Sequence, residues 1–365
     1  MKILILTKRQ TTHRDILDER FGRSWHLPHA LAELGHILEV HCLSYQDKTE
    51  GDILTFETGK GGKLTFNSLN AGPFGLFGFL QYARQTNRAV KEFRPDIIYA
   101  MSDTLYAILG HRLARQHRLR FFCDCQDNYE TYASARLPGI LPLFRRALAA
   151  ADGVTCVSAL LSEQLARHTS KILILNNGVS REVFFPRDQQ VCRRELNLPT
   201  ESRLIGFAGS LTPDRGLNIL FEGFERLKQE FRDLHLVLAG SSKIDIPRYE
   251  NIHHLGLLPH AKIPVFLNAL DLAVICNQPS RFYDYTFPIK TYEILACGIP
   301  FIASDHVSVK QVLRDYPDCL YLTGNIESFI RAAQRQLREP NPPRLPVVTW
   351  KDLGQRLESF FRSEH

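Results

Sequence analysis

The sequence predicts an α/β protein built from two doubly wound parallel sheets. The chain has 365 residues, more than a single hydrophobic core usually organises. Short apolar segments typical of buried strands alternate with longer helical segments, in two successive series. The alternation breaks near residues 186–203, where Pro186, Asp188 and a polar stretch follow one another. Such alternation indicates right-handed βαβ units and therefore parallel sheets.

The first series begins with a strand at 2–7. A helix at 25–34 ends at Gly35, the residue type that most often follows a helix C-terminus, and a helix at about 80–93 ends before Pro95. Further strands are expected at 37–43, 63–69, 97–100, 120–125, 153–158 and 172–175, and further helices at 106–117, 144–151 and 159–167.

The second series begins with a strand at 203–208. The rest comprises strands at 235–239, 252–255, 272–275 and 301–303 and helices at 217–229 and 259–269, with a further short helix inside 287–300. A proline-rich spacer at 339–343 then precedes an amphipathic helix at 350–361, which Thr349 is placed to cap. We therefore expect an N-terminal domain at 1–185, a second domain at 186–345, and a segment at 346–365 that returns to the first.

Composition narrows the classes of function. The formal charge is +6, most of it in the first half, which favours anionic ligands or an anionic membrane surface but is too dilute for nucleic acid. The chain has no apolar run of the ~18 residues that a membrane span needs. The short apolar run at 2–7, followed by Lys8 and Arg9, is expected to be a first strand rather than a signal peptide. The eight cysteines lack zinc-binding spacing, so we expect reduced thiols and a cytoplasmic location.

The segment 287–300 is the most informative in the chain. Lys290 and Glu293 stand three residues apart at the start of an apolar helix and share one face. A helix N-terminus with a lysine suits phosphate, and a carboxylate suits two vicinal hydroxyls such as those of a ribose. The alternative is an ordinary surface ion pair.

Several other segments, taken together with this helix, also indicate a site for a nucleotide. They are a glycine-containing loop at 206–216, an Asn-Gly-Val turn at 177–179, the polar run 127–130 after a strand, and the segment 151–158. Their order and spacing resemble the retaining GT-B glycosyltransferases often called family 4. The resemblance implies two Rossmann-like domains facing a central cleft, a nucleotide diphosphate sugar donor, a hydroxyl acceptor and no metal or other cofactor.

The chain also departs from the family pattern. Ser210 stands where the family usually has an arginine, Arg215 where it has a lysine, Tyr285 where it has a first glutamate, and Gln126 where it has a histidine. The Phe-Pro-x-Lys-x-x-Glu run at 287–293 resembles a subgroup common among cell-surface polysaccharide enzymes. Two alternatives therefore stay open: a nucleotide-sugar epimerase of the same architecture, or a non-catalytic subunit that binds nucleotide sugar.

The resemblance and the chemistry of the side chains together define the candidate residues. Asp127, Arg215 and Lys290 are the expected catalytic residues, since Asp127 could orient or deprotonate an acceptor hydroxyl and the two cations could stabilise a leaving diphosphate. The absence of any Asp-x-Asp pair predicts a site without metal. The expected donor-binding residues are Gly22, Arg23, Gly209, Ser210, Arg215, Lys290 and Glu293, and the expected acceptor-side residues are Asp127 and Glu130.

Two segments combine aromatic or aliphatic residues with arginines. Residues 73–80 precede Arg84 and Arg88, and residues 137–144 precede Arg145 and Arg146. Either segment could enter a membrane interface, and packing of a helix on the core is the alternative for both. A lipid-linked saccharide or another surface glycan is the expected acceptor.

Overall fold

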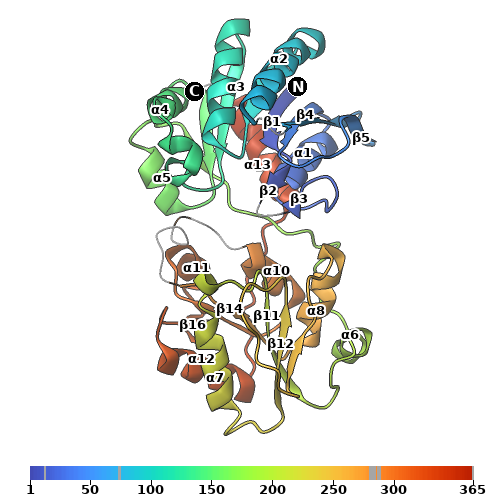
Figure 1. Ribbon diagram of the computed structural model, residues 1–365, viewed down its shortest axis with the longest axis vertical. Helices are drawn as coiled ribbons and strands as arrows, with labels where there is room; N and C mark the ends of the chain where they lie inside the picture. The colour runs from blue at the N-terminus through green and yellow to red at the C-terminus, as the bar shows by residue number, and fades with distance from the viewer. Residues whose placement is uncertain (12–13, 73–74, 279–284, 286–288, 364–365) are drawn as a thin grey trace. The chain divides into compact units, whose positions relative to one another are not determined.

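The chain folds into two compact units, shown in a computed structural model that describes residues 1–11, 14–72, 75–278, 285 and 289–363 (Figure 1). The first unit comprises Met1–Asn177 together with Trp350–His365, and the second comprises Gly178–Thr349. Contacts thus divide the chain after residues 177 and 349, whereas the sequence placed the divisions after 185 and 345. Residues 178–185 belong with the second unit because Phe184 packs in its core, and the chain leaving and re-entering this unit pairs through Val179 and Thr349.

The first unit is built on an eight-stranded sheet in the order β10-β9-β8-β7-β1-β4-β6-β5. Neighbouring strands are parallel, except that β5 pairs antiparallel with β6. The strands are β1 (Lys2–Lys8), β4 (Ile37–Ser44), β5 (Gly51–Glu57), β6 (Lys63–Asn70), β7 (Ile97–Ala100), β8 (Arg120–Cys125), β9 (Gly153–Cys156) and β10 (Ile172–Ile174).

Helices cover both faces of this sheet (Figure 1). They are α1 (Arg23–Glu33), α2 (Gly75–Phe93), α3 (Thr104–His117), α4 (Ile140–Ala149), α5 (Ala159–Leu165) and α13 (Trp350–Arg362). A short hairpin of β2 (Gln10–Thr11) and β3 (Arg14–Asp15) follows β1, and the 3₁₀ turns η1 (Tyr129–Thr131) and η2 (Ala133–Arg136) follow β8.

Helix α13 completes the core of the first unit. A Cβ atom at Gly354 would lie 2.7 Å from the Cβ of Ala30, so α13 and α1 approach closely where Gly354 leaves room. The ring of Phe361 lies 4.7 Å from that of Phe122 and 5.3 Å from that of Tyr99, centroid to centroid. The last helix therefore buries aromatic residues of the central strands.

The second unit has a six-stranded, all-parallel sheet in the order β13-β12-β11-β14-β15-β16. Its strands are β11 (Arg203–Ala208), β12 (Leu234–Ala239), β13 (Ile252–His254), β14 (Leu272–Ile275), β15 (Phe301–Ser304) and β16 (Leu320–Tyr321). Its helices are α6 (Gln189–Glu195), α7 (Leu217–Leu227), α8 (Ile263–Ala269), α10 (Ile289–Cys297), α11 (Val307–Val312) and α12 (Ile326–Arg338), with 3₁₀ turns η3 (Pro213–Arg215), η4 (His260–Lys262) and η5 (Pro317–Cys319).

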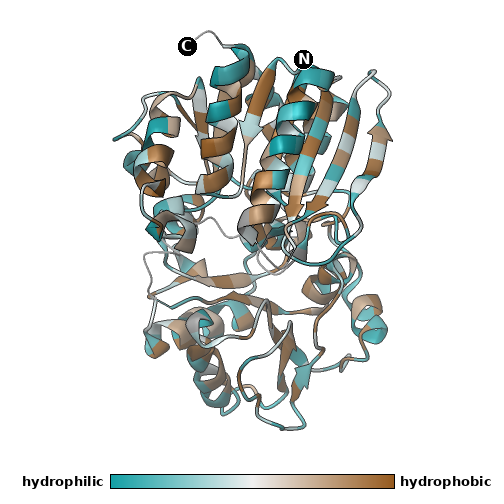
Figure 2. Ribbon diagram, turned by 45° about the horizontal axis from the view of Figure 1, so that its top comes forward, coloured by the Kyte–Doolittle hydropathy of each residue, from teal (hydrophilic) through white to brown (hydrophobic). Residues whose placement is uncertain are grey.

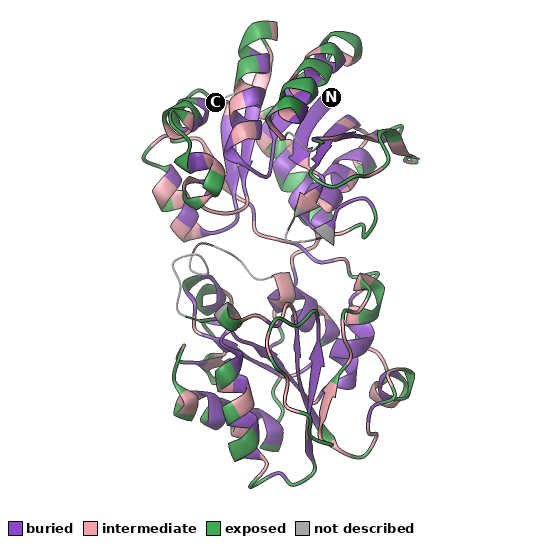
Figure 3. Cartoon of the chain, in the orientation of Figure 1, coloured by how far each residue is buried: buried purple, intermediate pink, exposed green. Residues whose placement is uncertain are grey.

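Two hydrophobic clusters hold this second unit together, and α7 and α12 contribute to one while α6, α8 and α10 contribute to the other. In each unit the central strands are buried and the outer sides of the helices are exposed, whereas the edge strands β5, β10 and β13 are partly exposed (Figure 3). Hydrophobic residues lie mainly on the strands and on one side of the helices (Figure 2). The predicted α/β fold with two doubly wound sheets is confirmed.

The two sheets share one topology. If β5 is set aside, both follow the doubly wound order in which the strand sequence reverses at one point, between β1 and β7 in the first unit and between β11 and β14 in the second. Ligands of open α/β sheets bind beyond the carboxyl ends of the strands at such a reversal. The candidate residues can therefore be judged by their distance from these two points.

The remaining features of the fold concern the cysteine thiols, the length of the helices and the elements that the sequence did not predict. All eight cysteines are buried and have free thiols. Within the described part of the chain, no helix is both long and apolar enough to cross a membrane. The sequence did not assign β5, α6, α11 or α12, and α2 begins at Gly75 rather than near residue 80.

Candidate functional site

Polar and charged residues of the second unit gather where β11 and β14 end. Gly209 and Ser210 follow β11, Cys276 and Asn277 follow β14, and Lys290 lies in the first turn of α10. These elements lie next to one another at one edge of the sheet (Figure 1). The structure thus brings the predicted residues Gly209, Arg215 and Lys290 to the point where the strand order reverses.

Lys290 lies directly against the bare backbone of Gly209. A Cβ atom at Gly209 would be 2.8 Å from the Nζ of Lys290, and the φ of 155° at Gly209 also disfavours a side chain there. The ammonium group is 5.7 Å from the centroid of the Phe207 ring, a distance typical of a cation–π contact. Because Gly209 lacks a side chain, the ammonium group of Lys290 can lie close against the backbone at the end of β11.

Gly240, at the end of β12, makes this arrangement possible. A Cβ atom there would come within 1.8 Å of the carbonyl oxygen of Gly209, so only glycine fits. The Gly209 amide in turn donates to the Ala239 carbonyl at 2.8 Å. The two glycines therefore set the path of the loop that leaves β11.

Arg215 joins the loop after β11 to the segment after β14. Its Nη1 donates to Oδ1 of Asn277 at 3.0 Å, and Nε2 of Gln278 donates to the Pro213 carbonyl at 2.9 Å. Burial raises the pKa of the Cys276 thiol to about 12, while the nearby cations Lys290 and Arg215 act in the opposite direction. Both cations thus lie close to one buried group, and together they form a site suited to an anion.

Glu293 lies in the same helix as Lys290 but is only 5% exposed. Its Oε1 is 3.7 Å from Nε2 of His260, whose ring meets that of Phe184 edge-on at 5.5 Å. Glu293 is therefore not part of a solvated helix face, and its predicted role in binding a ribose stays a prediction. A buried carboxylate needs polar partners, so Glu293 is placed to bind hydroxyl groups or to hold the fold.

Ser210 is half-buried in the loop after Gly209. Tyr285 is described, but Phe287 and Pro288 lie outside the described residues, so the structure does not show the start of the 287–293 segment.

In the first unit, Asp127 comes just after β8 and is half-buried. Tyr132 donates a hydrogen bond from its hydroxyl to Oδ2 of Asp127 at 2.7 Å. Burial raises the pKa of Asp127 to about 6, the Asp124 carboxylate acts in the same direction, and the Tyr132 bond opposes both. A carboxyl group that titrates near neutral pH can exchange protons at working pH.

Glu130 is engaged with its own surroundings. Its carboxylate accepts from Nε of Arg145 at 2.8 Å and lies 3.6 Å from Nε2 of His168. The hydrogen bond from Arg145 lowers the pKa of Glu130. Glu130 therefore ties η1 to α4, and its acceptor-side role stays a prediction.

Arg23 requires a correction. Its side chain is 2% exposed and pairs with both oxygens of Asp124 at 2.7 Å, and Nη1 also donates to the carbonyls of Leu175 and Asn176. The guanidinium is thus turned into the core, where it compensates a buried carboxylate, and does not extend toward a donor. Gly22, with a φ of 83°, is the residue before α1, and a Cβ atom there would meet open space.

The sequence analysis did not identify several other residues near the ends of these strands and beside the predicted site residues. Lys8 ends β1, Asp103 follows β7, and these two side chains form an ion pair. Asn277 and His260 contact the two predicted residues Arg215 and Glu293. A search for polar residues within three positions after every buried strand would have found Lys8, Asp103 and Asn277.

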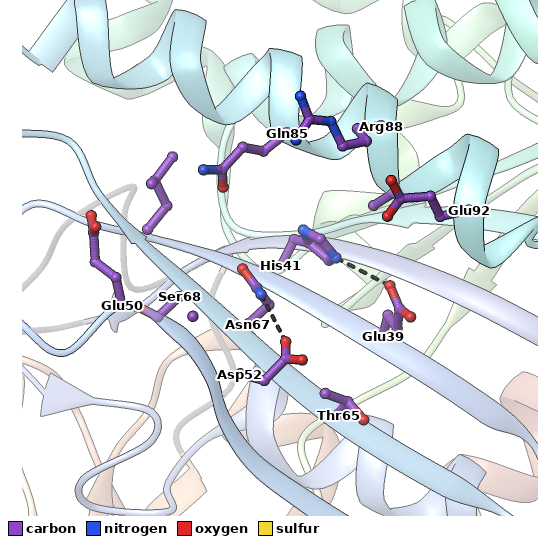
Figure 4. A pocket seen from close by; sticks show the side chains of 13 residues that line it. Glu39, His41, Glu50, Asp52, Thr65, Asn67, Ser68, Gln85, Arg88 and Glu92 are labelled. Carbon is purple, nitrogen blue, oxygen red and sulfur yellow. Dashed lines mark hydrogen bonds and ion pairs between the residues drawn. The ribbon is translucent and has the colours of Figure 1, made fainter.

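A polar cavity of about 440 Å³ lies elsewhere in the first unit, between α2 and the strands β4, β5 and β6 (Figure 4). His41 contacts Glu39 at 3.3 Å across its floor, and Asn67 donates to Asp52 at 2.8 Å. None of the predicted site residues lines this cavity. In the described part of the chain, no group of three or more His, Cys, Asp or Glu side chains is placed to hold a metal ion.

Two family models match the chain. Residues 23–178 match the model described as "Glycosyl transferase 4-like domain", and residues 202–339 match the model described as "Glycosyl transferases group 1". The two matches occupy the first and second units in turn and together span most of the chain.

Curated relatives match the chain over shorter regions. A D-inositol 3-phosphate glycosyltransferase from Stackebrandtia nassauensis is 28% identical over 178 residues, 43% of this chain and 39% of that protein. The putative teichuronic acid biosynthesis glycosyltransferase TuaH of Bacillus subtilis is 23% identical over 210 residues, 53% of this chain and 52% of that protein. The chain thus spans about half the length of these relatives or less.

Among solved structures, Alr3699/HepE of Anabaena in complex with UDP and glucose superposes with a TM-score of 0.71 and 14% identity, covering 100% of both chains. This likeness extends through both units and shows a shared fold.

Proposed function

The chain belongs to the family 4 type of GT-B glycosyltransferases, and from that membership we propose that it transfers a sugar from a nucleotide diphosphate sugar to a hydroxyl acceptor. The observation that supports this most is the pair of cations that act on the buried Cys276: Lys290, which lies against the backbone of Gly209, and Arg215, which donates to Asn277. The site lies in the unit whose family model is that of group 1 glycosyltransferases.

The cations would act on the leaving group. When the bond between the sugar and the diphosphate breaks, negative charge develops on the phosphate oxygens. Fixed donors and charges aimed at that oxygen stabilise the transition state more than the ground state. Lys290 would act as a point charge, and Arg215, held by Asn277, would present a planar set of donors.

Glu293 would bind the ribose of the donor through its carboxylate oxygens. Its neighbour His260 lies beside that carboxylate, with Nε2 3.7 Å from Oε1. Two hydroxyl groups that meet a buried carboxylate gain charge-assisted hydrogen bonds, which are stronger than those between neutral groups.

Asp127 would face the acceptor. Its pKa of about 6 keeps it mostly ionised at neutral pH, so it could orient or deprotonate an acceptor hydroxyl. Retention of anomeric configuration and independence from metal are further parts of the proposal, and both come from the family resemblance.

The acceptor that we propose is a saccharide of a cell-surface glycan or polysaccharide, free or lipid-linked. The support is the name of the teichuronic acid relative together with exposed apolar side chains, Phe77 on α2 and Leu137 and Leu143 around α4, near arginines. We accordingly propose a cytoplasmic protein that binds an anionic membrane surface peripherally, with no nucleic acid partner.

The test is a screen of nucleotide sugars with the purified chain. Each donor is incubated alone, with saccharide acceptors, and with acceptors in excess EDTA, and free nucleotide and sugar products are measured. Transfer that requires an acceptor and persists in EDTA would support the proposal. Conversion of a donor's sugar without acceptor would favour an epimerase, and binding without turnover of any donor would favour a non-catalytic subunit. Transfer that collapses in EDTA and returns with magnesium would refute metal independence.

A further inference from the structure

Four side chains of the first unit form a continuous chain of contacts at the carboxyl edge of its sheet. Lys8, the last residue of β1, pairs with Asp103, which follows β7. The Nζ of Lys8 lies 5.7 Å from the centroid of the Tyr132 ring. The Tyr132 hydroxyl then donates to Oδ2 of Asp127 at 2.7 Å. The contacts thus run from the point where the strand order reverses to the predicted acceptor-side carboxylate.

Asp103, at the end of this row of contacts that is farthest from Asp127, is held by several hydrogen bonds. Asp103 accepts from the hydroxyls of Ser134 at 2.6 Å and Thr104 at 2.8 Å, in addition to its pair with Lys8. Burial alone would raise the pKa of Asp103, but the Lys8 charge and these hydrogen bonds lower it overall. Asp103 is therefore an ionised anchor for Lys8.

Tyr132 itself has little freedom. It lies between η1 and η2, its amide donates to the Tyr129 carbonyl at 3.2 Å, and its ring centroid is 5.2 Å from that of Tyr129. Burial and the adjacent Asp127 raise the pKa of Tyr132, so its hydroxyl stays protonated and can donate throughout the working pH range.

The hydrogen bond from Tyr132 also distinguishes the two oxygens of Asp127. Oδ2 accepts the tyrosine proton. Among the residues that the structure describes, no donor contacts Oδ1. A carboxylate held in this way presents one oxygen in a defined direction to an incoming hydroxyl group.

We propose that Tyr132 is a positioning residue for the acceptor: its hydroxyl holds Oδ2 of Asp127 so that Oδ1 meets the acceptor hydroxyl, and the Lys8–Asp103 pair holds the Tyr132 ring. This inference rests on the proposed function, because it assumes an acceptor at Asp127. It adds three residues, Lys8, Asp103 and Tyr132, that sequence reasoning did not assign.

A pH dependence follows from the charged and titratable groups around Asp127. Tyr132 faces it from the turn after η1, Asp124 acts on it from β8, and Lys8 and Asp103 reach it only through the Tyr132 ring. Asp124 is compensated by Arg23, so Tyr132 provides the direct contact that favours ionised Asp127. Replacing Tyr132 by phenylalanine should therefore raise the pKa of Asp127.

The experiment compares Tyr132→Phe with the parent by two measurements. The first is the pH profile of kcat/KM for transfer, whose acidic limb should move up by about one pH unit, the change expected for the loss of one hydrogen bond to a charged group. The second is a carbon NMR titration of protein labelled at aspartate Cγ, with the Asp127 signal assigned by its disappearance in Asp127→Asn. The signal should titrate above pH 6 in the variant.

Tyr129→Phe is the matched control, because the Tyr129 ring is the tilted neighbour of the Tyr132 ring and its hydroxyl donates to the Asp124 carbonyl instead. It should leave both titrations unchanged. If Tyr132→Phe does not fold, Lys8→Met removes the charge over the ring and should lower kcat with little change in KM. Unchanged titration of Asp127 in Tyr132→Phe would overturn the proposal. Because the NMR titration needs no substrate, it tests the hold of Tyr132 on Asp127 separately from the proposed function, and the pH profile of kcat/KM then tests whether that hold serves transfer.

Discussion

The two units of this protein share a strand order but carry different chemistry beyond the carboxyl ends of their strands. In the first unit the strands lead into carboxylates, Asp103 and Asp127, surrounded by hydroxyl groups and one lysine. In the second they lead into glycines and two cations, Arg215 and Lys290. The difference teaches that the doubly wound sheet specifies where a ligand binds, while the few residues after each strand specify which ligand.

Side-chain volume separates the two sites as much as charge does. In the second unit Gly209 and Gly240 carry no side chains, so a ligand there would meet mainly the charges of Lys290 and Arg215. In the first unit Tyr132 fills the edge, so a ligand would meet side-chain oxygen atoms. The first site is therefore suited to a neutral hydroxyl and the second to an anion.

The largest expected effect concerns the first unit. Asp127→Asn should reduce transfer by about 10²- to 10⁴-fold, the range for loss of a group that handles a proton in the transition state. Binding of nucleoside diphosphate, measured by calorimetry, should stay unchanged because it belongs to the second unit. A comparable loss of nucleotide affinity would contradict the separation of roles.

The same substitution should stabilise the fold at neutral pH. Because the pKa of Asp127 is raised to about 6, native protein binds a proton between about pH 4 and 6 that the unfolded chain does not. Stability conferred by this group is thus lost as pH rises through that window. At pH 7.5 Asp127→Asn should recover up to about 3 kcal/mol in urea unfolding, and at pH 4 very little. Asp124→Asn is the contrasting control: it leaves Arg23 buried without its counter-charge and should cost about 3–5 kcal/mol.

A second prediction tests the cations of the other unit. Lys290→Ala should lower kcat/KM by about 10²- to 10³-fold, as expected when one fixed donor to a developing charge is removed. Calorimetry should show weaker binding of nucleoside diphosphate. The acidic limb of the pH profile of kcat/KM, which we assign to Asp127, should stay where it is in the parent. Lys228→Ala, which removes a lysine paired with Glu225 on α7, should leave both quantities at parent values. Equal losses in the two variants would mean that only net charge matters.

A third and smaller effect concerns Glu293. Glu293→Gln keeps the shape of a buried side chain but weakens its hydrogen bonds, so nucleotide-sugar affinity should fall about 10- to 150-fold, the equivalent of 1.5–3 kcal/mol. The loss should be much smaller for a 2′-deoxyribonucleotide, which lacks one of the hydroxyl groups. If both nucleotides lose affinity equally, Glu293 supports the fold beside His260 rather than the ribose.

The smallest expected effect concerns membrane binding, which we assign to the first unit. Phe77 on α2 is 74% exposed and Leu137 before α4 is 56% exposed. Replacing both by aspartate should weaken binding to vesicles rich in anionic lipid by about three- to tenfold at low salt. Leu257→Asp provides the control in the second unit, where that residue is 69% exposed. Equal losses from both surfaces, or no parent binding at low salt, would refute the assignment.

Much of the fold could be predicted because buried parallel strands are short, apolar and bounded by turns. Strands β7, β8, β11 and β14 begin and end where the sequence placed them. Strand β5 was missed because it is an edge strand with polar residues and no continuous apolar run. Helix α12 was not assigned from the sequence, although its apolar residues recur at helical spacing and its apolar face is buried.

The candidate site was predictable only in part, for a physical reason. Gly209, Arg215 and Lys290 could be placed from the sequence because each stands just after a strand or at the start of a helix. The orientation of a side chain depends on contacts that are distant in sequence. Arg23 turns inward because Asp124, far along the chain, needs a counter-charge. The role that we propose for Tyr132 could not be predicted from the sequence, because it depends on the hydrogen bond of its hydroxyl to Asp127.

The packing of α13 has a consequence for how the protein is made. The second unit is an insertion within the first, and Phe360 and Phe361 pack against the ring of Phe122, made much earlier in synthesis. During translation, part of the aromatic core of the first unit therefore stays uncovered until α13 has left the ribosome. The inserted second unit needs no later segment to complete its core, because all its strands lie in one continuous stretch of sequence. We expect nascent chains stalled before residue 350 to contain a folded second unit and a first unit that chaperones still bind.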